Sequence, residues 1–159
     1  GLLLERRLED LLSCGVSTLT VTINALDLRS ANQIYHDVFL DQYPARQDRL
    51  RQFLTAQRKG LYRACQAGMT VKINTVLIPG INENQIQGIA EMGKDAGATI
   101  MNIMPLIPCG KMGHSHPPDK ETMQRARELA ECYIPQFLLC RQCRADACGI
   151  PGRENEPRI

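Results

Sequence analysis

The chain alternates between segments whose apolar residues recur every three or four positions and shorter segments rich in β-branched residues. The first pattern is typical of helices that bury one face, and the second of strands. Four segments have the helical spacing: residues 3–12, 47–66, 82–97 and 119–132. Asn82 is predicted to be the N-cap of the third helix, with Gln85 as its capping-box partner, and Gly15 and Gly97 stand where helices stop.

Three segments predict strands: residues 18–23, 71–78 and 99–104. Residues 28–45 are irregular and aromatic, which indicates a short helix followed by a loop. Strands that alternate with helices pair in parallel through right-handed crossovers. We therefore predict an α/β fold. Three strands fit part of a β/α barrel better than a whole open sheet, although a doubly wound sheet has the same alternation.

Length and charge narrow the class of protein. A chain of 159 residues can bury one core, and a formal net charge of +2 gives no reason to expect a nucleic-acid partner. Basic residues do cluster, at spacings typical of the solvated face of a helix: Arg46, Arg49, Arg51, Arg58, Lys59 and Arg63. No apolar run is long enough to cross a bilayer and the first residues do not have the pattern of a signal peptide, so we expect a cytoplasmic protein.

Polar side chains occupy the three predicted strands or their carboxyl ends, where parallel β/α architectures bind ligands. Asn24 follows the first strand, Lys72 and Asn74 share one face of the second, and Asn102 lies in the third. Any one asparagine could simply cap a strand or bond to a loop. Their recurrence on three successive strands favours a polar small-molecule ligand.

The tail carries a C-x-x-C motif made of Cys140 and Cys143, whose thiolates can hold one metal ion or one cluster edge. Arg141 and Arg144 favour an anionic group nearby, such as a cluster. The spacing also fits a redox pair or half of a zinc site. Cys109, His114, His116 and Cys148 are the residues that could complete a zinc site.

The remaining thiols of the seven cysteines lie on predicted helices, beside apolar residues. An odd number of cysteines cannot pair completely in disulfides, and in a reducing compartment unpaired thiols are metal ligands or inert residues. Cys14, Cys65 and Cys132 are interpreted as inert core or boundary thiols.

Four strings together resemble the NifB family of radical S-adenosylmethionine (SAM) enzymes. They are TVTINA at 20–25, VKINTVLIPGIN at 71–82, NIMPL at 102–106 and CRQCRADA at 140–147. Each string is weakly specific, but their order and spacing are highly specific, and the resemblance runs from Gly1 to about Gly149. It implies the C-terminal portion of a partial (β/α) radical SAM barrel over residues 1–138. A cluster-binding Cys-rich tail and the chain terminus follow over residues 139–159.

The resemblance also implies cofactors and an activity. SAM is expected across the strand ends, at Asn24, Lys72, Asn74 and Asn102, with a [4Fe–4S] cluster that cleaves it to a 5′-deoxyadenosyl radical. Cys140 and Cys143 are expected to hold a substrate cluster. The implied reaction, that of a lyase-like enzyme of nitrogen fixation, fuses two [4Fe–4S] clusters around a SAM-derived carbide into the FeMo-cofactor precursor. Implied partners are iron–sulfur cluster donors and nitrogenase cofactor carrier or scaffold proteins.

The sequence departs from the family pattern in one decisive way. The C-x-x-x-C-x-x-C loop that carries the radical cluster occurs nowhere in this chain, so no catalytic cysteine can be assigned. We expect that loop upstream of Gly1 in a longer parent, and expect this chain alone to be inactive. Two alternatives stay open: another radical SAM protein, of the molybdenum-cofactor type, and a non-enzymatic zinc-binding interaction module.

Overall fold

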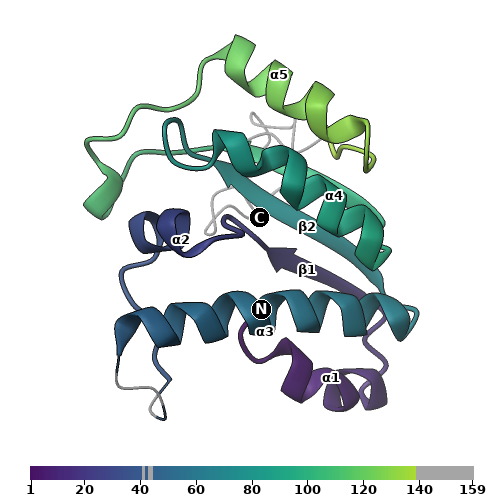
Figure 1. Cartoon of the computed structure of the whole chain (residues 1–159). Coiled ribbons are helices and arrows are strands. Elements are labelled where there is room, and N and C mark those ends of the chain that lie inside the picture. Colours follow the sequence, from purple (N-terminus) through teal and green to yellow (C-terminus); the bar gives the residue numbers. More distant parts are fainter. Residues whose placement is uncertain (41, 43–44, 139–159) are drawn as a thin grey trace, which may run out of the picture.

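The architecture is a parallel sheet with helices packed on one face (Figure 1). The computed structural model describes residues 1–40, 42 and 45–138. Strands β1 (Thr18–Thr22), β2 (Thr70–Leu77) and β3 (Ile100–Pro105) are hydrogen-bonded in chain order, and both neighbouring pairs are parallel. The predicted α/β fold with a parallel sheet is confirmed.

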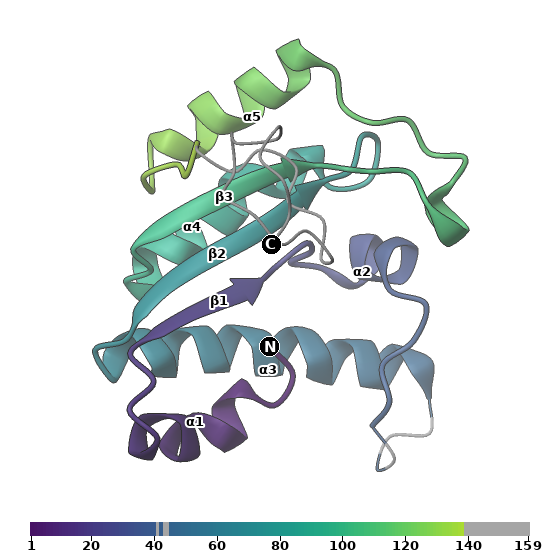
Figure 2. The ribbon, with the colours of Figure 1, turned by 180° about the vertical axis from the view of Figure 1, so that it is seen from behind.

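The helices follow the predicted apolar segments closely. They are α1 (Leu4–Ser13), α2 (Leu28–Ile34), α3 (Arg46–Gln66), α4 (Ile86–Ala96) and α5 (Lys120–Glu131), with short 3-10 turns η1 (Glu83–Gln85) and η2 (Gly110–Met112). Helices α3, α4 and α5 lie side by side against the sheet, and α1 packs on α3 (Figures 1 and 2). Figure 2 views the sheet from its other side, with the strands in front of α4.

The two faces of the sheet differ in chemistry because side chains alternate along a strand. In β2, Val71, Ile73 and Leu77 are buried against the helices, whereas Lys72 and Asn74 on the opposite face are only half-buried. The buried apolar face supplies the hydrophobic stabilisation of the fold. The opposite face is therefore available for polar chemistry.

Two glycines let helices approach their neighbours closely. A β-carbon on Gly60 of α3 would stand 3.0 Å from Cβ of Leu4 and 3.2 Å from the backbone nitrogen of Glu5 in α1. A β-carbon on Gly93 of α4 would stand 2.7 Å from Cδ1 of Ile73 in the sheet. Glycine at these positions sets the spacing of α1 against α3 and of α4 against β2.

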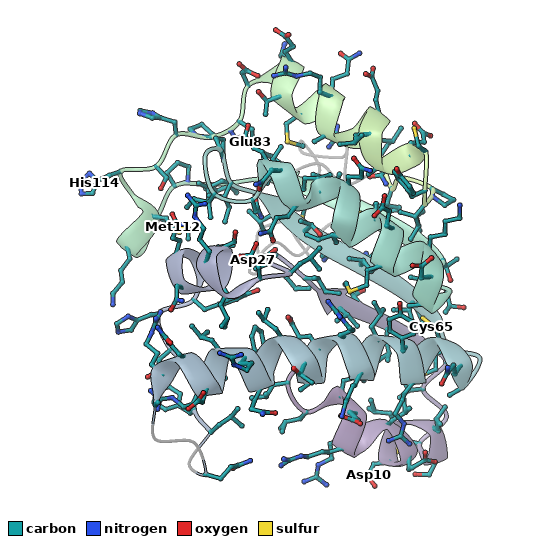
Figure 3. The ribbon with its side chains drawn as sticks, viewed as in Figure 1. Asp10, Asp27, Cys65, Glu83, Met112 and His114 are labelled. Atoms are coloured by element: carbon teal, nitrogen blue, oxygen red, sulfur yellow. The ribbon has the colours of Figure 1, made fainter. Side chains whose placement is uncertain are left out.

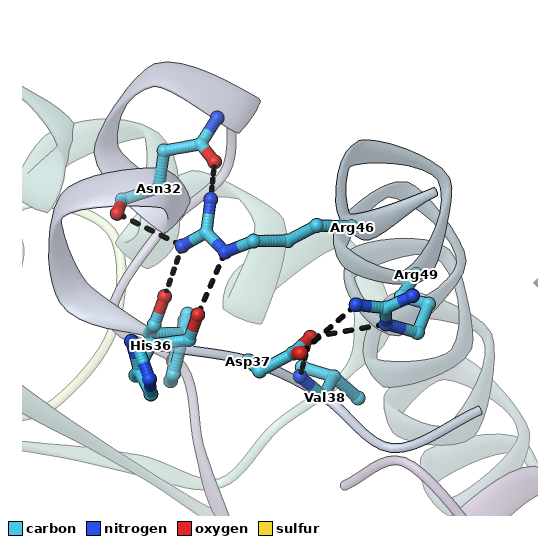
Figure 4. A network of polar contacts seen from close by, with 7 residues as sticks. Asn32, His36, Asp37, Val38, Arg46 and Arg49 are labelled. Carbon is cyan, nitrogen blue, oxygen red and sulfur yellow. Dashed lines mark hydrogen bonds and ion pairs between the residues drawn. The ribbon is translucent and has the colours of Figure 1, made fainter. Parts of the chain in front are cut away.

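The prediction of a solvated basic face on α3 is wrong for its first two arginines. Arg46 donates to the backbone oxygens of Asn32, Tyr35 and His36 and to the Asn32 side chain (Figure 4). Arg49 holds both carboxylate oxygens of Asp37, at 3.0 and 2.9 Å. These arginines fasten the loop after α2 to α3, because that loop lacks regular backbone pairing and needs donors for its carbonyl oxygens.

The interpretation of three cysteines as core or boundary thiols holds for one of them. Cys65 is half-buried on α3, and this burial raises the pKa of its thiol. Cys14 and Cys132 are exposed, because they follow the last residues of α1 and α5, beyond the apolar stripes of those helices. No helix in the described part of the chain is long and apolar enough to cross a membrane.

Candidate functional site

The candidate site is the polar face of the sheet, defined here by Lys72, Asn74 and Asn102. Asn74 and Asn102 are register partners on β2 and β3, and the Asn102 amide donates to Oδ1 of Asn74 at 3.2 Å. Lys72 lies two residues before Asn74, so its side chain leaves the same face. The predicted common face of Lys72 and Asn74 is therefore observed, and the register adds Asn102 to it.

Asn102 carries the clearest sign of a missing partner. Its side chain is 2% exposed, yet its Oδ1 has no hydrogen-bond partner among the described residues. A buried amide oxygen without a donor costs about 1–3 kcal/mol, so native proteins rarely leave one unpaired. This oxygen is suited to accept a hydrogen bond from a hydroxyl, amino or ammonium group of a ligand.

Lys72 places the positive charge of the site. Its Nζ lies 5.0 Å from the centre of the Phe137 ring, and no ion pair of Lys72 is found within the described ranges. An ammonium over an aromatic face is held by the ring quadrupole while its charge remains available. Phe137 had no role in the sequence analysis. Its contact with Lys72 joins residues 65 positions apart, which no local pattern reveals.

Asn24 forms hydrogen bonds with other groups of the protein. Its Oδ1 accepts from the backbone N–H of Val76 at 2.9 Å, and its backbone oxygen accepts from Nδ2 of Asn82, also at 2.9 Å. Asn24 also bonds to the hydroxyl of Tyr35, whose pKa is raised by burial and lowered in part by these bonds. The geometry supports a brace between strand ends; a direct contact of Asn24 with a ligand stays a prediction.

Asn82 is the principal residue of this region that sequence reasoning misassigned. It is fully buried, accepts from the backbone N–H of Ile78 at 2.8 Å and donates to the oxygens of Asn24 and Val76 at 2.9 and 2.8 Å. Asn82 stands at the N-cap position of η1, which leads into α4 at Ile86, but it makes no side-chain capping bond. Its amide turns instead toward backbone groups at the strand ends.

The predicted capping-box role of Gln85 is wrong as well. Its Oε1 accepts from the backbone N–H of Leu26 at 2.8 Å, and its Nε2 donates to Asp27 and to Oγ of Ser30. Gln85 therefore ties η1 to the segment that follows β1. Asn82 and Gln85 together fix the carboxyl edge of the sheet.

The predicted metal ligands are not assembled in the described part of the chain. Cys140, Cys143 and Cys148 lie outside the described residues. Cys109, His114 and His116 belong to the loop after β3, where Figure 3 shows the His114 side chain pointing outward. No group of three or more metal-ligating side chains occurs within residues 1–40, 42 and 45–138. The zinc site weighed from the sequence thus finds no support among its described members.

A separate cavity of about 400 Å³ lies on the helical side of the sheet, between α3, α4 and residues 25–28. Its lining mixes apolar Leu54 and Met92 with basic Arg51 and Arg58. Because none of Lys72, Asn74 and Asn102 lines it, this cavity is distinct from the polar face.

Comparison of the fold alone gives solved structures with a similar fold. A domain of a pyruvate-formate lyase-activating enzyme from Bacteroides vulgatus aligns with a TM-score of 0.58 and 16% identity, over 80% of this chain and 70% of that one. At this identity the likeness concerns the fold alone, and it agrees with the predicted portion of a (β/α) radical SAM barrel. No protein-family model matches the chain.

Sequence comparison gives several relatives named FeMo cofactor biosynthesis protein NifB. The protein of Methanocaldococcus jannaschii is 42% identical over 94% of this chain and 50% of its own length. That of Klebsiella pneumoniae is 40% identical over 100% of this chain and 36% of its own length, and that of Azotobacter vinelandii 34% over 97% and 32%. The chain thus resembles NifB proteins along nearly its whole length and spans half of their length or less.

Proposed function

We propose that this chain is part of a radical SAM iron–sulfur enzyme of FeMo-cofactor biosynthesis. In this proposal the parent enzyme fuses two [4Fe–4S] substrate clusters with insertion of a SAM-derived carbide. The observation that carries it is the polar face with the unpartnered Asn102 oxygen, in a chain that resembles NifB over 94% of its residues. A lyase-like classification, a cytoplasmic location, and cluster donors and cofactor carriers as partners belong to the same proposal.

The residues of the polar face fit SAM chemically. The Lys72 ammonium can neutralise a carboxylate, and the unpartnered Oδ1 of Asn102 can accept from a hydroxyl or amino group. Asn74 accepts from the Asn102 amide and so orients that Oδ1. Bound with a reduced [4Fe–4S] cluster, SAM supplies the 5′-deoxyadenosyl radical and the methyl group. Asn24 would act indirectly, by holding the strand ends together.

The direction of the chain after α5 supports Cys140 and Cys143 as ligands of a substrate cluster. Gln136 forms a parallel bridge with Met101 of β3, so residues 135–137 run toward the carboxyl edge of the sheet. The two cysteines follow within a few positions. Two thiolates at this spacing can hold one cluster edge, and Arg141 and Arg144 suit its negative charge.

A first experiment tests the tail by anaerobic reconstitution of the chain with iron and sulfide. Cys140→Ala and Cys143→Ala should each remove most of the bound iron and the brown chromophore. Cys65→Ala is the control, because its half-buried thiol lies on α3 and belongs to no C-x-x-C motif. Equal iron in all four proteins would refute the assignment, and a colourless protein that binds zinc would favour the zinc-binding module.

A second experiment tests the polar face in a chimera. The matching half of the Methanocaldococcus jannaschii relative is replaced by this chain, and release of 5′-deoxyadenosine from SAM is measured. Loss of one hydrogen bond to a charged ligand group costs about 1.5–3 kcal/mol, so Lys72→Met or Asn102→Leu should lower the release at least tenfold. Cys65→Ala should not. If both substituted chimeras fold, hold iron and release 5′-deoxyadenosine at the rate of the unsubstituted chimera, the SAM site lies elsewhere.

A further inference from the structure

The segment between α5 and the tail is attached to the outer edge of β3. The backbone N–H of Met101 donates to Pro135 at 2.9 Å, and that of Phe137 donates back to Met101 at 2.7 Å. Just before this bridge, Ile134 is 1% exposed within the hydrophobic core. Residues 134–137 are thus fixed by burial and by backbone pairing before the chain reaches its cysteines.

The bridge determines which way Phe137 faces. Gln136 is the register partner of Met101, whose side chain lies on the helix-covered face, so the next residue points to the opposite, polar face. There the Phe137 ring meets the Lys72 ammonium, 5.0 Å from its centre. Phe137 is half-buried and therefore rests on the sheet while contributing its ring face to the site.

This contact joins two segments of the chain to which the proposed function gives different roles. Lys72 on β2 carries the positive charge of the polar face, whereas Phe137 stands three positions before Cys140. A lysine stem is flexible, and without a partner it would extend into solvent. An aromatic ring within about 6 Å restrains the ammonium without neutralising it.

We infer that Phe137 is a positioning residue: it holds the Lys72 ammonium over the polar face and, through the same contact, reinforces the pairing with β3 that fixes residues 134–137, which precede the cysteine tail. The inference rests on the proposed function for the roles of Lys72 and the tail. Its consequence is that occupancy of the polar face and binding of iron by the tail are coupled through one cation–π contact.

The first test detects the contact between Lys72 and Phe137 in protein that holds no cluster. Lysines of the full chain are dimethylated with ¹³C-formaldehyde, and Lys72→Arg identifies the Lys72 signal by its disappearance. The Phe137 ring current should move this signal away from those of exposed lysines. Phe137→Leu should return it to their position, while Phe137→Tyr, which keeps the ring, should not. A Lys72 signal unchanged in Phe137→Leu would overturn the inference.

The second test measures how firmly the tail holds iron. After reconstitution with iron and sulfide, the rate of iron loss to a chelator is compared among the variants. Phe137→Leu and Lys72→Met should each lose iron about three- to tenfold faster, their combination no faster than either alone, and Phe137→Tyr and Lys72→Arg at the unmodified rate. Equal rates in Phe137→Leu and the unmodified chain would overturn the coupling. If the unmodified chain holds no iron, the proposed function fails, and the methyl signal alone decides whether Phe137 positions Lys72.

Discussion

Replacing Asn82 with alanine should destabilise the protein more than its place in a short turn suggests. The side chain is fully buried and satisfies three backbone groups: the N–H of Ile78 and the oxygens of Asn24 and Val76. Asn82→Ala removes all three hydrogen bonds and leaves those groups buried. At about 1 kcal/mol net for each bond, the free energy of unfolding should fall by about 3 kcal/mol.

The assay is urea unfolding followed by far-UV circular dichroism, since the chain contains no tryptophan. Asn84→Ala is a matched control, because Asn84 is an exposed asparagine of the same turn. The urea midpoint should fall in Asn82→Ala, with an unchanged slope, and stay near that of the unmodified chain in Asn84→Ala. Asn82→Asp should cost at least as much as alanine, because a carboxylate would face two carbonyl oxygens.

The reasoning would be refuted if Asn82→Ala and Asn84→Ala had unfolding free energies within about 0.5 kcal/mol of each other, the usual range for surface substitutions. That result would mean that water replaces the Asn82 amide without loss. It would also remove the basis for regarding Asn82 as the brace that holds Asn24 at the end of β1.

Three further predictions concern packing, pH and the site. Gly60→Ala should destabilise by about 1 kcal/mol in the same urea assay, since overpacking of 1–3 kcal/mol against Leu4 outweighs a gain of about 1 kcal/mol in helix propensity; an increase in stability would contradict this. Hydrogen bonds from Arg49 hold the pKa of Asp37 below its usual value, so their stabilisation is present above the unfolded pKa and lost as pH falls below about 4. Thermal melts should therefore depend less on acid in Asp37→Asn than in the unmodified chain, and equal dependence would count against the contact. Asn102→Leu should change the melting temperature little while weakening SAM binding, because removal of a buried oxygen without a partner offsets the lost hydrogen bond to the half-buried Asn74; a large fall in the melting temperature together with weaker SAM binding would make Asn102 a structural residue only.

The fold was largely predictable because its apolar periodicities are local. The predicted strand at 71–78 differs from β2 (Thr70–Leu77) by one residue at each end, and the predicted helix at 47–66 differs from α3 (Arg46–Gln66) by one. The shared face of Lys72 and Asn74 was also predictable, since alternation along a strand places them there without knowledge of distant contacts. Lys72, however, lies in the first half of β2 and not at its carboxyl end, and the role of these residues in a site stays a prediction.

The errors have a common physical cause. Asn82 and Gln85 fit a local capping pattern, but their amides reach backbone and side-chain groups more than 50 positions earlier, in the segment that follows β1. Arg46 looked like part of a solvated helix face, yet the loop after α2 offers it backbone oxygens that only tertiary folding brings near. Phe137 escaped notice because a cation–π contact leaves no signature in spacing.

The parallel register has a consequence for the order of folding. The contacts of Asn102 with Asn74 and of Asn24 with Val76 span 28 and 52 positions respectively. Closing the longer loop costs about 0.5 kcal/mol more in chain entropy, so the β2–α4–β3 unit should form first and β1 should dock onto it later. Ile103→Val should then mainly slow refolding and Val21→Ala should mainly speed unfolding, and the opposite pattern would reverse the order. On this hypothesis, the polar face is assembled in two steps, with the Asn74–Asn102 pair in place before Asn24 closes the edge.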